Sequence, residues 1–306
     1  MSTPTLDAVT RGRVRRARRR LTVLTVLGVL VAAMYAVSLM AGRTFYPPDD
    51  IIRVILGETV PGATFTVGTL RLPRATLALL AGLCFGLGGV TFQTMLRNPL
   101  ASPDVIGISS GASAAAVVGI VLFSLSGTAV STVAVAAALG VALLIYGLAF
   151  KNGVAGTRLI LIGIGVGAML TSVINYVLTK AGQWDYQEAL RWLTGSLNGT
   201  TWTAVLPALV ALLVLAPVLL GQAKNLSALQ LGDDTAAALG VRVERTRLIA
   251  IVAAVGLVAF ATAACGPIAF VSFLAGPIAA RIVGPHGSLL VPAALVGALL
   301  VLVADL

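Results

Sequence analysis

Long apolar stretches separated by short polar ones run along nearly the whole chain. A transmembrane helix needs roughly 20 apolar residues, and most of the stretches reach that length. The eighth is the weakest because Pro267, Gly276, Pro277 and Arg281 interrupt it. The pattern predicts an all-α polytopic membrane protein with about nine transmembrane helices, and it lacks the short alternating segments of a membrane β-barrel. The stretches lie at residues 21–41, 74–96, 105–125, 127–150, 158–179, 203–221, 247–265, 267–283 and 289–304.

Composition excludes a soluble globular domain. Hydrophobic residues make up 58% of the 306 residues and charged residues only 10%, whereas soluble domains carry about 25% charged residues. The mean hydropathy is +1.01. We therefore treat residues 21–306 as one transmembrane domain with short connections.

The net charge of +10 is concentrated ahead of the first apolar stretch, where seven arginines lie between Arg11 and Arg20. Basic residues flanking a transmembrane helix stay on the cytoplasmic side, so residues 1–20 are predicted to form a cytoplasmic N-terminal tail. This placement favours membrane orientation over nucleic-acid binding and is compatible with contact to anionic lipids. The stretch is not a cleavable signal peptide, because it is too long and no small-residue cleavage site follows.

Alternating the stretches across the membrane gives a consistent topology. With the tail included, basic residues are more numerous inside than outside, as the positive-inside rule requires. Those predicted inside are Lys151, Arg158, Lys224, Arg242, Arg245 and Arg247. Those predicted outside are Arg43, Arg53, Arg71, Arg74, Lys180 and Arg191, accompanied by Asp49, Asp50, Glu58, Asp185 and Glu188.

Signatures of enzymatic chemistry are absent from the sequence. It contains no G-x-x-x-x-G-K-[ST], C-x-x-C, H-E-x-x-H or G-x-S-x-G pattern. The single histidine, His286, falls short of the several convergent ligands that a metal site needs. Cys84 and Cys265 lie in apolar stretches, where no disulfide is expected. We predict no enzyme, no metal and no cofactor on this chain, so a partner would supply any ATP-derived energy.

Ionisable residues are scarce within the apolar stretches. Asp104 and Asp305 lie at stretch ends, and Arg281 lies near the end of the eighth. Ion-coupled carriers place acidic groups or histidines at mid-membrane to bind the coupling ion. A secondary transporter is therefore the disfavoured alternative from another mechanistic class, and a non-transport membrane scaffold is a third.

Small residues recur at four-residue spacing, in the pairs Gly82 and Gly86, Gly107 and Gly111, and Gly163 and Gly167. Such pairs let transmembrane helices pack closely. Neutral polar residues on the third and fifth stretches are candidates for lining a pathway. They are Ser109, Ser110, Ser113, Thr171, Ser172 and Asn175.

The longest polar segment predicted on the cytoplasmic side covers residues 222–247. Asp233 or Asp234 is expected to cap a short helix over Thr235–Leu239 by accepting backbone N–H bonds. Gly240 then lies where a helix end requires positive φ. A second short helix is expected at Asn225–Gln230, so that the segment forms a compact knob.

Several motifs together resemble the permease subunits of type II ABC importers, the FecCD family of iron–siderophore, haem and cobalamin transporters. The first is the stretch from Arg71 to Gly111, which enters a helix through R-L-P-R and breaks at N-P-L-A-S-P, with Asn98, Pro99 and Pro103 at the break. The others are L-G-D-D-T-A-A-A-L-G-V, R-W-L-T-G-S-L and C-G-P-I-A-F-V-S-F. The last favours the siderophore branch. The resemblance implies a type II importer permease fold and ATP-driven import of ferric siderophores, with haem and cobalamin as alternatives.

The resemblance also implies partners and sites. It implies a bacterial cytoplasmic membrane, a second permease subunit, two ATPase subunits holding ATP and Mg²⁺, and an extracytoplasmic binding protein. Arg71, Arg74 and Arg191 would dock the binding protein, while Gly156 and Thr157 would lie at the cytoplasmic gate. Residues 222–247 would couple to the ATPase. The coupling residues implied are Leu231, Gly232, Asp233, Asp234, Thr235, Ala238, Leu239 and Gly240.

Two departures from the family pattern are visible. The chain reads Ala275-Gly276-Pro277-Ile278 where many members read V-P-H or A-P-Q, so the kink of the eighth helix is expected to differ. Family members also continue into a tenth span, whereas this sequence stops at Ala304-Asp305-Leu306. We expect that the sequence is truncated before that span.

Overall fold

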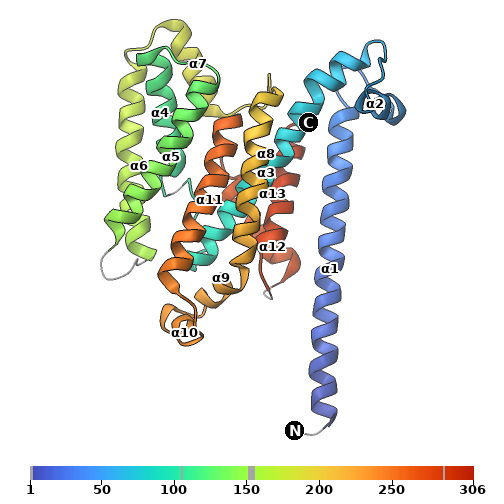
Figure 1. The fold of residues 1–306 in the computed structure, drawn as a ribbon, viewed down its shortest axis with the longest axis vertical. Coiled ribbons are helices and arrows are strands. Elements are labelled where there is room, and N and C mark those ends of the chain that lie inside the picture. Colours follow the sequence, from blue (N-terminus) through green and yellow to red (C-terminus); the bar gives the residue numbers. More distant parts are fainter. Residues whose placement is uncertain (1–2, 105, 151–155, 285–286) are drawn as a thin grey trace.

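The computed structural model describes residues 3–104, 106–150, 156–284 and 287–306, which fold into helices joined by short connections (Figure 1). No β-strand occurs among these residues. The elements are α1 (Thr3–Met40), α2 (Pro48–Ile55), the π-helical η1 (Thr64–Arg71), α3 (Leu72–Leu96), α4 (Ile108–Phe123), α5 (Thr128–Ala149), α6 (Gly156–Leu178), α7 (Gln183–Thr194), α8 (Trp202–Gly221), α9 (Ala223–Leu229), α10 (Asp233–Ala238), α11 (Val243–Cys265), α12 (Val271–Val283) and α13 (Leu290–Ala304).

Each predicted span coincides with a helix, which confirms the all-α membrane architecture. Within the described residues, six helical stretches are long and apolar enough to cross a membrane. The spans predicted at 105–125, 267–283 and 289–304 are shorter in the structure, since α4, α12 and α13 contain 16, 13 and 15 residues. Helices α4 and α12 start late because the residues before them, Gly107 and Phe270, have positive φ.

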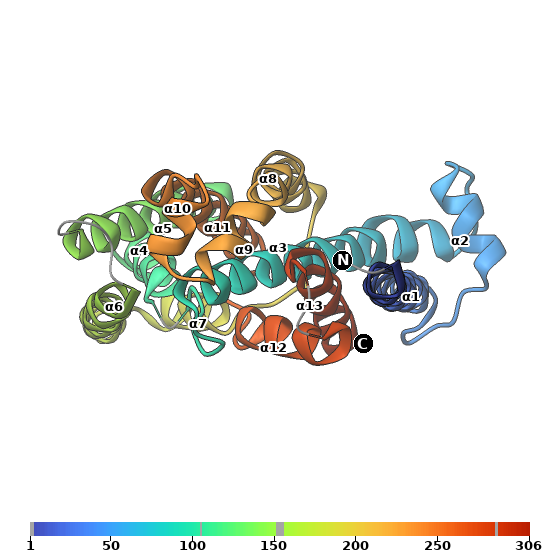
Figure 2. The ribbon, with the colours of Figure 1, turned by 90° about the horizontal axis from the view of Figure 1, so that it is seen from below.

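Helix α3 occupies the centre of the molecule (Figure 2). It packs against α13, α11, α12 and α8, and its most apolar window is 83% buried, compared with 17% for α1 and 22% for α6. Helix α3 is rich in glycine and alanine, and these small side chains let the surrounding helices approach it closely. The central helix thus depends on protein contacts, whereas α1 and α6 present most of their surface outward.

Backbone contact between α3 and α13 confirms the predicted packing role of one glycine pair. A Cβ atom added to Gly82 would lie 2.4 Å from the carbonyl oxygen of Gly297, and one added to Gly86 would lie 2.2 Å from that of Ala293. Both distances are far below van der Waals contact, so only glycine fits at these two positions.

Helix α12 contains Pro277, whose ring nitrogen has no hydrogen to donate to the carbonyl of Phe273 one turn earlier. The side chain of Gln93 on α3 takes over this role, because its Nε2 donates to the Phe273 oxygen over 3.0 Å. Gly276 makes room for the amide, since a Cβ there would lie 1.9 Å from Gln93 Oε1. The proline, the glycine and the glutamine therefore form one structural unit between α12 and α3.

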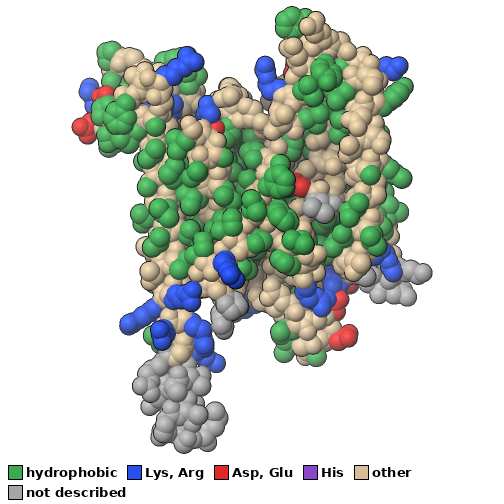
Figure 3. All heavy atoms as spheres, turned by 180° about the vertical axis from the view of Figure 1, so that it is seen from behind, with side chains coloured by type: hydrophobic (Ala, Val, Ile, Leu, Met, Phe, Trp, Pro, Cys, Tyr) green, Lys and Arg blue, Asp and Glu red, His purple; other side chains and the backbone are tan. Residues whose placement is uncertain are grey.

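The two ends of the bundle carry different elements (Figure 1). Helices α9 and α10 lie at the end toward which the N-terminus points, while α2 and α7 lie at the opposite end. Lys and Arg side chains lie at both ends, and a broad hydrophobic band covers the middle (Figure 3). Cys84 and Cys265 are buried and free, as predicted. His286 and Lys151 lie outside the described residues.

Candidate functional site

The 222–247 segment folds into two short helices, α9 and α10, followed by the start of α11. Helix α9 is anchored by Leu226 and Leu229, which are 1% and 0% exposed. Helix α10 buries only Ala236. Two leucines that flank α10, Leu231 and Leu239, are each 63% exposed. The segment therefore has a well-packed base and an outer part with few apolar contacts.

The predicted cap of α10 is wrong. Gly232, with φ of +107°, occupies the N-cap position, and no side chain caps the helix. The helix consequently starts at Asp233 and not at Thr235. Neither aspartate caps it, because both lie within the first turn, and the carboxylate of Asp233 is bound by two arginines.

The C-terminal end of α10 follows the prediction. Gly240 has φ of +84° and its N–H donates to the carbonyl of Ala237 over 2.9 Å. The N–H of Val241 donates to the carbonyl of Ala236 over 3.0 Å. This pair of bonds is a Schellman motif, which requires a residue able to adopt the left-handed conformation at the position of Gly240.

The ion pairs of Asp233 connect the segment to two membrane helices. Its carboxylate accepts hydrogen bonds from Arg247 Nη2 on α11 at 2.7 and 2.8 Å. It also accepts one from Arg97 Nη2, at the end of α3, at 3.0 Å. The side chain of Arg247 is only 6% exposed. The sequence leaves open whether Arg247 contacts the ATPase rim or only follows the positive-inside rule, and in the structure its side chain is buried.

A second acid extends this cluster. Arg247 Nη1 donates to Glu244 Oε1 over 3.3 Å, and the hydroxyl of Tyr146 on α5 donates to Glu244 Oε2 over 3.3 Å. Sequence reasoning missed Arg97 and Tyr146. The signal for Arg97 was weak, since a single arginine before an Asn-Pro break is also explained by membrane orientation.

The remaining predicted coupling residues lie on the outer surface of the segment. Asp234, Thr235, Ala238, Leu239 and Gly240 are exposed, and so is Leu231 before α10. Gly232 is partly exposed beside them. This surface combines one carboxylate with apolar and small side chains, a composition suited to insertion into a cleft of another protein.

The arginines predicted to dock a binding protein have partners within the chain. Arg71 donates to the carbonyls of Leu39, Met40 and Thr44 over 3.0, 2.9 and 2.6 Å. Its guanidinium also lies 5.1 Å from the ring centroid of Tyr46. These contacts fasten the end of α1 to the start of α3, and the docking role of Arg71 stays a prediction.

Arg74 is similarly engaged, while Arg191 is open. Arg74 Nη2 lies 2.8 Å from Asp305 Oδ1, and its Nη1 donates to Asn198 Oδ1 over 2.7 Å. Arg191 is exposed in the last turn of α7. All three arginines belong to elements at the end opposite α9 and α10 (Figure 1).

The predicted gate residues lie beside the end of α3. Gly156 begins α6, and a Cβ added there would lie 3.2 Å from a methyl carbon of Leu96. Thr157 is exposed next to it. The break after α3 is stabilised by Asn98, whose Oδ1 accepts the N–H of Leu100 over 2.9 Å. Pro99 is exposed and Pro103 is buried in the connection to α4.

The predicted pathway residues differ in their exposure in the single chain. Ser109 is buried and donates to the carboxylate of Asp104. Ser110 is partly exposed on α4, and Asn175 is exposed on α6. Their role in a pathway stays a prediction.

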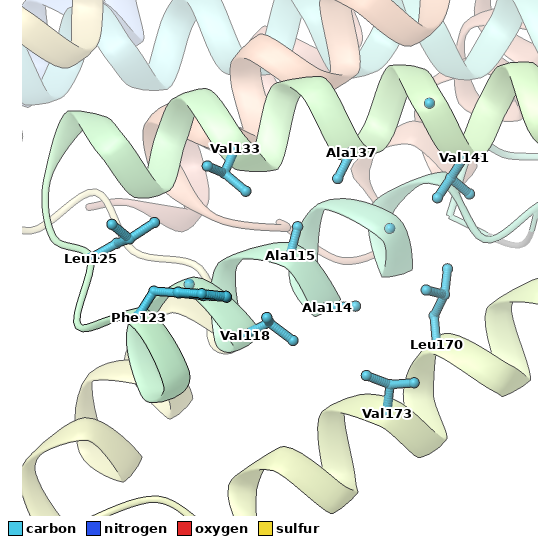
Figure 4. Close-up of a pocket in the computed structure, with 13 residues that line it drawn as sticks. Ala114, Ala115, Val118, Phe123, Leu125, Val133, Ala137, Val141, Leu170 and Val173 are labelled. Carbon is cyan, nitrogen blue, oxygen red and sulfur yellow. The ribbon is translucent and has the colours of Figure 1, made fainter.

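A groove among α4, α5 and α6 has a volume of about 710 Å³. Its wall is apolar, with Val118, Phe123, Leu125 and Leu170 pointing toward the space (Figure 4). A polar iron chelate needs hydrogen-bonding partners, so this groove is unsuited to bind one. Among the described residues, no group of three or more His, Cys, Asp or Glu side chains is placed to hold a metal ion.

Comparison with known proteins identifies the family of this chain. A model of the FecCD transport family matches residues 29–306. The chain belongs to the FecCD transport family. This confirms the resemblance drawn from the motifs, and it makes the chain a transporter permease.

Individual FecCD relatives span most of the chain. The ferric enterobactin transport system permease protein of Escherichia coli (strain K12) is 40% identical over 92% of this chain and 85% of its own length. The achromobactin transport system permease protein of Dickeya dadantii (strain 3937) is 37% identical over 91% of this chain and 80% of its own. A solved metal-chelate type ABC transporter in an inward-facing conformation has a TM-score of 0.83 and 28% identity, covering 93% of this chain and 89% of that one.

Proposed function

We propose that this FecCD-family chain is the permease subunit through which an ABC importer moves a ferric siderophore into the cytoplasm. The observation that carries the substrate class is the 40% identity to a ferric enterobactin permease along 92% of the chain. The achromobactin permease at 37% identity points to the same class. Cobalamin and haem are the competing cargoes, and the experiment below separates them.

The energy for transport comes from separate ATPase subunits that bind the 222–247 segment. The exposed surface around α10 supports this role, because Leu231 and Leu239 project from a firmly anchored base without burial in the chain. The sequence also carries no phosphate-binding loop of its own. Closure of the ATPases on ATP and Mg²⁺ would then displace this surface relative to the membrane.

The assembly has two permease subunits, two ATPases and an extracytoplasmic binding protein, in a bacterial cytoplasmic membrane. The orientation places the N-terminus in the cytoplasm. Its support is that the arginine-rich start of α1 and the 222–247 segment lie toward the same end of the bundle (Figure 1). Arg71, Arg74 and Arg191 then face the binding protein.

Uptake of radio-iron tests this proposal. Cells lacking the gene and cells carrying it receive iron loaded on catecholate, hydroxamate or carboxylate siderophores, with labelled haem and cobalamin in parallel. The membrane potential is held constant while ATP is depleted. Gene-dependent and ATP-dependent iron uptake is the expected result. Uptake of cobalamin or haem alone would show that the cargo is not a ferric siderophore. Uptake that does not depend on ATP would overturn the ABC mechanism.

A further inference from the structure

We infer that Asp233 is a positioning residue that ties α10 to α3 and α11, so that movement of α10 reaches the membrane helices. Arg247 and Arg97 are its partners in this tie. The inference rests on the proposed function, since it assigns a coupling role within the same segment. It also divides that segment into an inner aspartate that transmits movement and an outer surface that binds the ATPase.

The geometry of the tie is that of strong charge-assisted hydrogen bonds. Arg247 Nη2 contacts both carboxylate oxygens of Asp233, at 2.7 and 2.8 Å. Arg97 Nη2 contacts the same carboxylate at 3.0 Å. Arg247 lies within the first turns of α11, and Arg97 is the C-cap of α3. One carboxylate thus joins α10 to the neighbouring α11 and to α3, which lies 136 residues earlier in the chain.

The position of Arg97 indicates that this contact is specifically built. Its backbone is left-handed, with φ of 52° and ψ of 33°, a conformation that is unfavourable for residues other than glycine. The turn ends α3 and places the guanidinium beside α10. A Cβ atom added to Gly232 would lie 3.7 Å from Arg97 Nη1. The strained turn and the ion pair occur at one residue.

The apolar packing of α10 is too sparse to transmit its movement to the membrane helices. Helix α10 has six residues and buries only Ala236, while Leu231 and Leu239 are each 63% exposed. Firm apolar anchoring is found in α9, where Leu226 and Leu229 are buried. A force on α10 therefore reaches α3 chiefly through the Asp233 carboxylate, and the same carboxylate reinforces the short chain connection between α10 and α11.

Glu244 and Tyr146 extend the tie to α5. Glu244 Oε1 accepts from Arg247, and its Oε2 accepts from the hydroxyl of Tyr146, both over 3.3 Å. The guanidinium of Arg247 binds two carboxylates, those of Asp233 and Glu244. Its side chain is only 6% exposed, so these contacts are shielded from water. Three membrane helices therefore converge on the base of α10.

The neighbouring aspartate provides a matched comparison. Asp234 is exposed, and among the described residues no ion pair or side-chain hydrogen bond to it is found. Replacing Asp233 and Asp234 by asparagine removes the same charge at adjacent positions. The two variants differ only in whether the carboxylate faces the membrane helices or the outside.

The first test measures coupling in the complete complex. The importer, with its ATPases and the binding protein loaded with radio-iron enterobactin, is reconstituted in liposomes, and iron transported per ATP hydrolysed is recorded. Asp233→Asn should lower this ratio by about fivefold or more, the lower range of typical coupling effects, with ATPase co-purification unchanged. Asp234→Asn should instead lower ATPase co-purification and keep the ratio in the assembled fraction. An unchanged ratio in Asp233→Asn overturns the inference.

The second test needs only the permease and so does not depend on the proposed function. Spin labels on Ala237→Cys and Leu248→Cys report the distance between α10 and α11; both native cysteines are buried. Asp233→Asn and Arg247→Gln should each broaden the distance distribution, and the double variant should broaden it no further. Glu58→Gln, which breaks an exposed ion pair at the other end, is the control.

The two tests separate the possible failures. Unchanged distributions in both single variants overturn the tie even if the importer transports iron. Conversely, a wild-type complex without ATP-driven uptake overturns the proposed function, and the spin-label distances still decide whether Asp233 holds α10 in place.

Discussion

The hydrogen bond between Gln93 and Phe273 offers a sharp test of how the α12 kink is stabilised. Pro277 leaves the Phe273 carbonyl without its helical donor, and Gln93 Nε2 replaces that donor at 3.0 Å. Gln93→Met keeps the length of the side chain but removes the donor. Pro277→Ala restores a backbone N–H that can reach the same carbonyl.

The expected magnitude follows from the environment of the bond. Gln93 is 7% exposed, so water cannot replace it readily. Hydrogen bonds between membrane helices contribute about 0.6 to 1.7 kcal/mol, and leaving a buried acceptor unpaired costs about 1–3 kcal/mol. We therefore expect Gln93→Met to lower the free energy of unfolding by about 1–2 kcal/mol in the Pro277 background.

The double-mutant cycle distinguishes this mechanism from general loss of packing. In the Pro277→Ala background the carbonyl has a backbone donor again, so Gln93→Met should cost less than half as much. Equilibrium unfolding of the purified chain by SDS in mixed micelles, followed by circular dichroism, measures all four variants. Equal costs of Gln93→Met in the two backgrounds would falsify the shared-carbonyl account.

Three further predictions concern packing, burial and the far end of the bundle. Gly86→Ala should destabilise the chain by about 1–3 kcal/mol in the same unfolding assay, because its Cβ would lie 2.2 Å from Ala293 O; Gly165→Ala, with open space around it, is the control and should be neutral or slightly stabilising. Cys84 and Cys265 should resist maleimide labelling in the folded chain and react after denaturation, and rapid labelling of either in the native state would contradict their burial. The side chain of Asp305 is 11% exposed and pairs with Arg74. Asp305→Asn should weaken this pair and lower the free energy of unfolding by about 1–3 kcal/mol. Glu58→Gln, in an exposed pair, should change the free energy of unfolding by less than about 1 kcal/mol.

Much of the fold could be predicted because apolar stretches longer than about 18 residues have few alternatives to membrane helices. The predicted spans were too long where apolar residues continue beyond the end of a helix. Residues 101–103 and 106–107 before α4 are buried without being helical, and the segment 266–270 before α12 is also irregular. Hydropathy cannot distinguish these residues from helix, because tertiary contacts such as Ser196 N–H to the Cys265 carbonyl determine their conformation.

The 222–247 segment shows the same limit at the level of single residues. Gly240 was predictable because a local pattern, a short helix followed by glycine, determines its role. Asp233 was not, because an aspartate at a helix start serves equally as a cap or as an ion-pair partner. Its actual role depends on Arg247, 14 residues away, and on Arg97, 136 residues away.

The central position of α3 has a consequence for how the protein is made. Gln93 emerges 180 residues before Phe273, the residue whose carbonyl it binds. At a synthesis rate of about 5–20 residues per second, α3 waits roughly 10–40 seconds for α12. During that interval Gln93 lacks the carbonyl that its amide binds in the folded chain, and Gly82 and Gly86 lack their contacts with α13. A helix that ends up largely enclosed by protein therefore spends this interval without α12 and α13, so lipid or the insertion machinery must cover that face in the meantime.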